Sequence, residues 1–360
     1  MTAGDATEGG RMPESCFRSR VYWLTFLLSL LVIWVHSYNA ELFLEAGQAR
    51  DCVNRLEQLI GNSLGQIAVP GFFVVSAYLF YRRFTLKKLR DKWRSRIKSL
   101  AVPYVLWNIL YYFGYIAATR LPVLSEISGK GPIPVSVQEF FQAAVYYKYN
   151  PVFWYLFQLI ILVALAPVLY ALLRKNGPGL FFMLILVYGL WKNKELPLLN
   201  LDALFYYSAG AFTALHKDGW GRFVEAKASL RQGIESLFLL LLSFALLIFL
   251  GQPGGPLYLL PLYTVFWRFL GVCAAVFAVK FFPFGMEKEW MRHNFFLYAI
   301  HFALVRLINK MGAHFLPPKP AVALGLFLLM PVFMVAASAG IRKILMKICP
   351  RAYGILAGGR

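Results

Sequence analysis

The sequence predicts an all-helical fold, a polytopic integral membrane bundle of about ten transmembrane helices with both termini on the cytoplasmic side. The first supporting observation is composition. The 360 residues are 59% hydrophobic and 15% charged, whereas soluble domains are about 45–50% apolar and about 25% charged. Long apolar runs and an uneven distribution of Lys and Arg are the other two observations. Together they disfavour a soluble domain, a disordered chain and a disulfide-rich module.

The apolar runs are long enough to cross a bilayer, which takes roughly 20 residues. The first, Val21 to Tyr38, follows a basic segment and has no small-residue cleavage site after it, so it is interpreted as a span and not a signal peptide. The runs lack strand alternation, and lipid offers no partner for open backbone groups, so they are predicted to be helices. Nine further runs begin near Ile67, Leu100, Pro151, Gly179, Leu199, Gly233, Leu257, Asn294 and Ala321.

Orientation follows from the basic residues, since cytoplasmic loops of membrane proteins carry an excess of Lys and Arg. With the N-terminus inside, 26 of the 37 cations fall on the cytoplasmic side, 9 on the opposite side and two inside apolar runs. The predicted organisation is a basic N-terminal segment (1–20), a transmembrane domain (21–341) and a basic tail (342–360). The net charge of +20 is then mainly a topology signal, which disfavours nucleic acid as a partner.

The densest basic block is RRFTLKKLRDKWRSRIK, with nine cations between Arg82 and Lys98. One interpretation is a positive-inside boundary that also attracts anionic lipid headgroups. A second is a cytoplasmic docking surface for a phosphorylated donor, because guanidinium forks match phosphate oxygens. The two interpretations are compatible.

Ionisable groups inside apolar runs are candidate functional residues because the membrane penalises them. His36, near the outer end of the first run, suits a general base for a hydroxyl; the alternative is an interfacial histidine between Trp34 and Tyr38. His301 either bonds to a neighbouring helix or belongs to a site, and Arg306 follows it at a spacing that does not match one helical face. Arg268 pairs either with a substrate anion or with a carbonyl. The five histidines are too dispersed to predict a metal site.

Five motifs in order resemble the acyltransferase 3 family of multi-pass membrane acyltransferases, which includes sugar and peptidoglycan O-acetyltransferases. The resemblance runs from about Val21 to Ile341. VIWVHS is similar to the family's V-V-x-x-H-S, whose histidine is the proposed catalytic residue. The other four segments are GFFVVSAYLFYRRF, RIKSLAVPYVLWN, PVFWYLFQLIIL and HNFFLYAIHFALV. The chain departs from the family pattern at Thr25 and Ser99, where many members have a cation, and at Tyr22, where Asp is frequent.

The resemblance implies an O-acyltransferase of the inner, cytoplasmic membrane that uses acetyl-CoA or another acyl-CoA as donor substrate, with no permanently bound cofactor. The acceptor would be a cell-envelope sugar, a lipid-linked glycan or a small hydroxylated molecule. His36 would be the catalytic base. Donor binding would fall to Arg94, Arg96 and Lys98, and substrate binding to Trp154, Tyr155, Arg268, His301 and Arg306. The departures keep a second class open: a transporter or membrane-embedded binding domain on the same scaffold.

Overall fold

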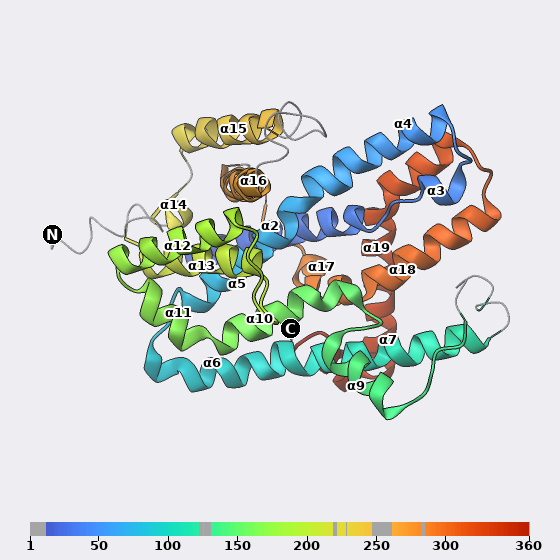
Figure 1. The fold of residues 1–360 in the computed structure, drawn as a ribbon, viewed down its shortest axis with the longest axis horizontal. Helices are drawn as coiled ribbons and strands as arrows, with labels where there is room; N and C mark the ends of the chain where they lie inside the picture. The colour runs from blue at the N-terminus through green and yellow to red at the C-terminus, as the bar shows by residue number, and fades with distance from the viewer. Residues whose placement is uncertain are drawn as a thin grey trace. The chain divides into compact units, whose positions relative to one another are not determined.

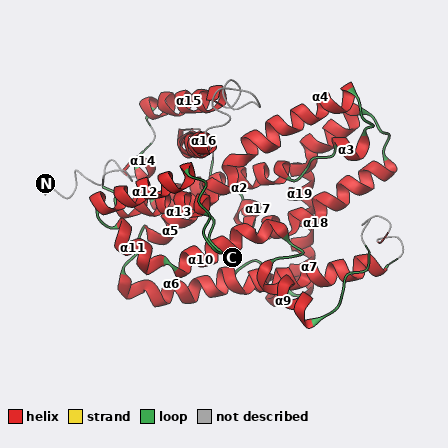
Figure 2. Ribbon diagram, in the orientation of Figure 1, coloured by secondary structure: helices red, strands yellow, loops and turns green. Residues whose placement is uncertain are grey.

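A computed structural model of the chain describes residues 12–121, 125, 131–218, 222–227, 229–246, 261–281 and 285–359. Within these ranges the named elements are all helices (Figure 2), apart from one isolated bridge between Leu196 and Leu199. This confirms the all-helical class. The longer helices are α2 (Glu14–Val35), α4 (Gln48–Glu57), α5 (Ala68–Tyr81), α7 (Val102–Arg120), α9 (Val137–Tyr146), α10 (Trp154–Ala164), α12 (Asn176–Trp191), α13 (Leu201–Leu215), α15 (Leu230–Ala245), α16 (Pro261–Phe281), α18 (Asn294–Phe315) and α19 (Pro320–Ile348).

Six stretches of the described chain are long and apolar enough to cross a membrane, which indicates a multi-pass protein. They are Glu14–Phe43, Gln48–Tyr81, Leu86–Arg120, Leu262–Phe281, Asn294–Phe315 and Pro320–Ile348. The short helix α3 (Ala40–Phe43) ends the first stretch, and α6 (Leu89–Arg96) lies near the start of the third. Two π-helical turns, Gln58–Ser63 and Ile97–Ala101, lie inside the second and third stretches. The predicted start of a run near Leu257 lies outside the described residues.

A seventh candidate span is bent. Helices α10 and α11 (Ala166–Leu173) pass the length and hydropathy test together but meet at 66°. Pro167 stands in the first turn of α11 and has no backbone N–H, so it cannot continue the hydrogen-bond ladder of α10. The sequence run beginning at Pro151 is therefore a broken helix.

The chain divides into two compact units, each built from three separate segments. Unit 1 comprises Met1–Leu28, Gln66–Arg90 and Ile161–Arg292, and unit 2 comprises Ser29–Gly65, Asp91–Ile160 and His293–Arg360. Helix α2 therefore begins in unit 1 and ends in unit 2.

In unit 1, α5 packs against α13, and the close approach depends on glycine. A Cβ on Gly210 would meet the backbone of Val74, 2.8 Å from its Cα, so a side chain at this position would push the two helices apart. The Tyr206 hydroxyl donates to the carbonyl of Val265, 3.0 Å away, and links α13 to α16. Unit 1 is thus organised around an almost fully buried α13.

In unit 2, α9 runs beside α7 (Figure 1). Tyr104 and Tyr112 of α7 donate hydrogen bonds to the carbonyls of Val145 and Pro134, at 2.6 and 2.8 Å. Because early residues of α7 meet the end of α9, the two helices are antiparallel. Helices α18 and α19 form a second packed pair in this unit.

The tail predicted for residues 342–360 is helical in most of its length. Helix α19 continues to Ile348 and α20 (Pro350–Leu356) follows it. The Trp107 indole donates to the carbonyl of Leu356 at 2.9 Å, which docks α20 on α7. Beyond it, Gly358 has φ of +73° and lies against the carbonyl of Ser99, a position where a side chain would be strained.

Candidate active site

His36 stands one residue beyond the end of α2, in unit 2. Its backbone N–H still bonds to the carbonyl of Ile33, so the residue closes the last turn of the helix. The side chain is half-buried. In the described part of the chain its ring nitrogens have no hydrogen-bond partner, whereas its ring contacts two aromatic neighbours. An imidazole held by ring packing keeps both nitrogens available for chemistry.

His301, on α18, lies beside His36. The two ring centroids are 5.4 Å apart and the ring planes are inclined by 44°. His301 is 1% exposed, and its Nδ1 bonds to the carbonyl of Tyr298 in the preceding turn. A carbonyl oxygen only accepts, so Nδ1 carries the proton and Nε2 of the neutral ring is left as an acceptor. This Nε2 is buried and has no partner among the described residues.

The hydrogen bond of His301 therefore runs within its own helix and not to a neighbouring one. A buried polar atom without a partner is costly, and native proteins keep few of them. An open acceptor next to the unbonded ring of His36 is the arrangement that a hydroxyl-bearing ligand would complete.

Aromatic rings surround the histidine pair. The ring of Phe302 meets the ring of His36 edge-on, with the centroids 5.4 Å apart. The ring centroids of Tyr298 and His301 are 5.6 Å apart. Tyr155, at the start of α10, contacts Tyr298 edge-on at 6.0 Å, so it stands one ring further from His301. Trp154 precedes it and is half-buried. The structure thus connects Tyr155 to the two histidines through Tyr298.

The backbone that follows His36 is held by two buried side chains. Glu57, fully buried at the end of α4, accepts from the N–H groups of Asn39 and Ala40 at 3.1 and 3.4 Å. Asn309 of α18 donates to the carbonyls of Ser37 and Tyr38 at 3.1 and 3.3 Å.

These bonds fix the chain on the C-terminal side of His36. The sequence interpretation missed both anchors, because neither Glu57 nor Asn309 belongs to a motif or is close to His36 along the chain. A glutamate at the end of an amphipathic helix and an asparagine near the end of an apolar one carry no local signal of this role.

Arg306 lies on the same side of α18 as Phe302, with its guanidinium carbon 5.4 Å from the centre of the Phe302 ring. Phe302 also contacts His36, so Arg306 is linked to the histidine pair through this ring. Among the described residues it has no carboxylate partner.

Arg268 belongs to unit 1 and has partners there. Its Nη2 donates to Gln66 Oε1 at 3.0 Å, and its Nη1 lies 3.8 Å from Asp202 Oδ2. The sequence left open whether Arg268 meets a substrate anion or a carbonyl. In the structure the nearest anion is a carboxylate of the chain itself.

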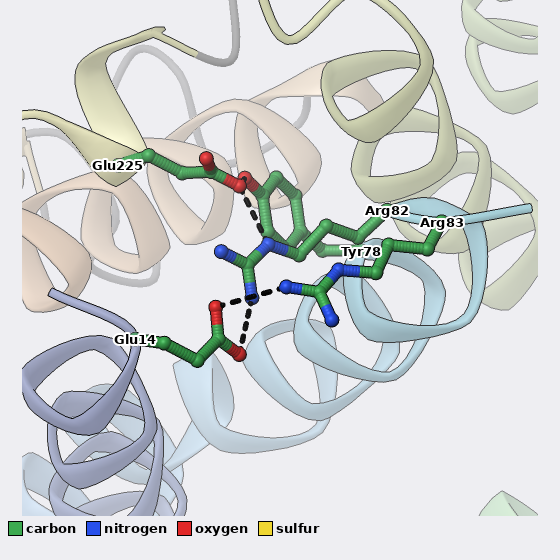
Figure 3. Close-up of polar contacts among 5 residues, drawn as sticks. All are labelled: Glu14, Tyr78, Arg82, Arg83 and Glu225. Atoms are coloured by element: carbon green, nitrogen blue, oxygen red, sulfur yellow. Dashed lines mark hydrogen bonds and ion pairs between the residues drawn. The ribbon is translucent and has the colours of Figure 1, made fainter. Parts of the chain in front are cut away.

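The basic block divides into a paired and an exposed part. Arg82 Nε donates to Glu225 at 2.6 Å and Nη1 donates to Glu14 at 3.0 Å, while Arg83 donates to the other Glu14 oxygen at 3.2 Å (Figure 3). Tyr78 adds a bond to Glu225 at 2.9 Å. Burial alone would lower the pKa of Arg82, but the carboxylates of Glu225 and Glu14 raise it above its ordinary value. These two arginines join segments of unit 1, so the block as a whole is not a free docking surface.

The cations expected to bind a donor lie further along the block. Arg94 and Arg96 are on α6, and Lys98 is in the π-helical turn that follows. Arg94 and Lys98 are exposed and Arg96 is half-buried. Thr25, one of the positions where the chain departs from the motif pattern, bonds back to the carbonyl of Val21 at 2.9 Å. Within the described ranges no group of three or more His, Cys, Asp or Glu side chains could hold a metal ion.

Comparison with known proteins identifies the family. The acyltransferase domain family matches residues 21–341. A curated relative, the succinoglycan biosynthesis protein ExoH of Rhizobium meliloti (strain 1021), is 24% identical over 209 residues, which are 55% of this chain and 54% of ExoH. The chain thus matches about half the length of this relative. No solved structure matches the chain. Because the family match covers most of the sequence, including both histidines, the chain belongs to the acyltransferase 3 family.

Proposed function

We propose that this chain is an integral membrane O-acyltransferase that moves an acyl group, most simply acetyl, from cytoplasmic acyl-CoA to a hydroxyl of a cell-envelope glycan or a small acceptor. The observation that carries the proposal is the pair of imidazoles in unit 2, with ring centroids 5.4 Å apart. Among the described residues, the ring of His36 has no hydrogen-bond partner and His301 has an open acceptor nitrogen. The family membership supports the reaction class, and the name of the curated relative supports a glycan acceptor.

In the proposed reaction the acceptor hydroxyl gives its proton to an imidazole nitrogen of His36. The acceptor oxygen bonds to the thioester carbonyl carbon, the carbon–sulfur bond breaks, and the thiolate of coenzyme A takes up the proton. The product is an ester. A positioned base contributes typically about 10²–10⁴-fold to such a step. The open Nε2 of His301 would accept a hydrogen bond from a second hydroxyl and fix the orientation of the acceptor.

The neighbouring aromatic rings suit a sugar-like acceptor. Tyr298 and Phe302 pack against the histidines, and Tyr155, with Trp154 beside it on α10, lies one ring further away. In this proposal Arg268 has a structural role, because Asp202 and Gln66 already engage it.

The donor would bind through the exposed end of the basic block. Arg94, Arg96 and Lys98 offer charge-assisted hydrogen bonds to the phosphates of acyl-CoA. The proposal places this end and both termini on the cytoplasmic side of the inner membrane. Ten spans are reached if the bent pair counts once and α12, α13 and α15 cross beside the six longer stretches.

The test compares purified wild-type protein with His36→Ala, incubated with radiolabelled acetyl-CoA and envelope material. His314→Ala is the matched control, since His314 lies on α18 with its ring exposed against Phe315. We expect His36→Ala to lower transfer by at least about 100-fold and His314→Ala to leave it unchanged. Undiminished transfer by His36→Ala would refute the assignment. Movement of a solute without any transfer would favour the transporter alternative.

A further inference from the structure

Arg306 stands near the middle of α18, a helix that is long and apolar enough to cross a membrane. It is twelve residues from the first residue of α18, Asn294, and nine from the last, Phe315. At about 1.5 Å per residue, it lies about 18 and about 14 Å from the two ends, near the centre of a hydrocarbon layer about 30 Å thick. Long basic side chains reach the interface only from positions near helix ends. This arginine therefore has to find its stabilisation inside the protein.

The partners of Arg306 do not balance its charge. Among the described residues, its interaction is with the face of the Phe302 ring at 5.4 Å, and no carboxylate joins it. A cation–π contact is worth about 0.5–2 kcal/mol, less than the cost of a cation near the bilayer centre. Arg268 shows the alternative in unit 1, where Asp202 supplies the anion.

The position of Arg306 relates it to the histidine pair. Phe302 receives the guanidinium on its face and meets the His36 ring edge-on, both at 5.4 Å. An anionic group bound to Arg306 would therefore place the neighbouring part of the same molecule beside His36.

We propose that Arg306 binds a carboxylate or phosphate of the acyl acceptor, so that the enzyme selects an acidic glycan over a neutral one. The proposal rests on the proposed function, because it takes the molecule beside His36 to be the acceptor. Binding supplies the missing counter-charge, and the bidentate geometry of guanidinium with these anions orients the adjacent hydroxyl toward His36.

The binding test uses thermal melting of the detergent-solubilised protein with glucuronate, glucose 6-phosphate and glucose at matched ionic strength. We expect the wild-type Tm to rise by about 2 °C or more with at least one of the two anions and not with glucose. The anion that gives the larger Tm shift shows whether Arg306 prefers a carboxylate or a phosphate. Arg306→Gln should lose the shift and Arg306→Lys should keep part of it. An equal response to glucose, or a full shift in Arg306→Gln, would overturn the proposal.

Two further melting measurements distinguish anion binding by Arg306 from a purely structural role of this residue and from the acyl-transfer reaction. Without ligand, Arg306→Gln should melt at or above the wild-type temperature, since the variant removes a half-buried charge that no carboxylate of the described residues balances; a marked fall would show a structural role and contradict the proposal. His36→Ala should keep the anion-dependent shift even where transfer is lost. If wild-type protein shows the shift but transfers no acyl group, the proposed function fails while anion binding by Arg306 stands.

Discussion

The two units differ in the partners they give to ionisable residues in or beside their apolar helices. In unit 1, Arg82 is paired with Glu14 and Glu225, and Arg268 lies next to Asp202. In unit 2, Nε2 of His301 has no partner among the described residues. Arg306 contacts the aromatic ring of Phe302, whereas these arginines of unit 1 contact carboxylates. The same sequence signal, an ionisable residue beside or within an apolar run, therefore has two outcomes. A partnered charge holds the fold together, and an unpartnered one is a candidate for ligand binding.

Removing a charge should change the free energy of unfolding in opposite directions for paired and unpaired residues. Removing one member of a buried ion pair leaves the other charge uncompensated and destabilises the protein. Removing a charge that had no partner takes away a cost and leaves stability unchanged or raised. Stability measurements on matched variants can therefore assign each arginine to one group, independently of activity.

The largest stability effect is expected at Arg82. Arg82→Gln leaves Glu225, whose side chain is 13% exposed, without its cation, so we expect the free energy of unfolding to fall by about 2–3 kcal/mol. Arg83→Gln is the control, because Arg83 is 73% exposed and its pair with Glu14 should contribute at most about 0.5 kcal/mol. Thermal melting in detergent measures both. Equal shifts for the two variants would contradict the role given to Arg82.

A smaller effect is expected for Arg268 and Asp202, which are 3.8 Å apart and partly exposed. Asp202→Asn should lower stability by about 1 kcal/mol, a value reduced for solvent screening. In the double variant with Arg268→Gln, most of that loss should be recovered, because no unbalanced charge remains. A double-mutant cycle from melting temperatures gives the coupling energy. Strictly additive losses would mean that the two side chains do not interact.

The smallest effect concerns an exposed pair in unit 2. Hydrogen bonds from Lys148 and Tyr149 hold the pKa of Glu139 below its ordinary value of 4.5. Because the folded-state pKa is lowered, the stabilisation is present above the ordinary value and is lost as pH falls through the folded-state pKa. Melting curves between pH 7 and about pH 3 should therefore converge for wild type and Lys148→Met at the acid end. A difference that persists at low pH would contradict this pair as the source.

Much of the fold can be predicted from the sequence, because it depends on local signals. Apolar runs of sufficient length predicted the long apolar helices. Short motifs marked His36 and His301 as candidate site residues, and the structure places their rings side by side. Helix ends were less predictable: α2 begins at Glu14, seven residues before the predicted start, since a polar turn can extend an apolar helix.

Partners distant along the chain could not be predicted. Arg82 pairs with Glu14 and Glu225. The backbone after His36 is held by Glu57 and Asn309. No local sequence pattern indicates any of these contacts. The nine-cation block illustrates the result. The sequence pattern treated the whole block as one basic surface. In the structure, its first two arginines, Arg82 and Arg83, form ion pairs with carboxylates of unit 1.

The interleaving of the two units bears on biogenesis. Unit 2 takes its segments from the beginning, the middle and the end of the chain, and His36 is synthesised long before α18. Until α18 and α19 arrive, Asn39 lacks the Ala323 carbonyl that its side chain bonds to, and the Ser37 carbonyl lacks Asn309. In early assembly intermediates these polar groups therefore lack the partners that later helices supply. The histidine pair can therefore be completed only after α18 has been added to the chain.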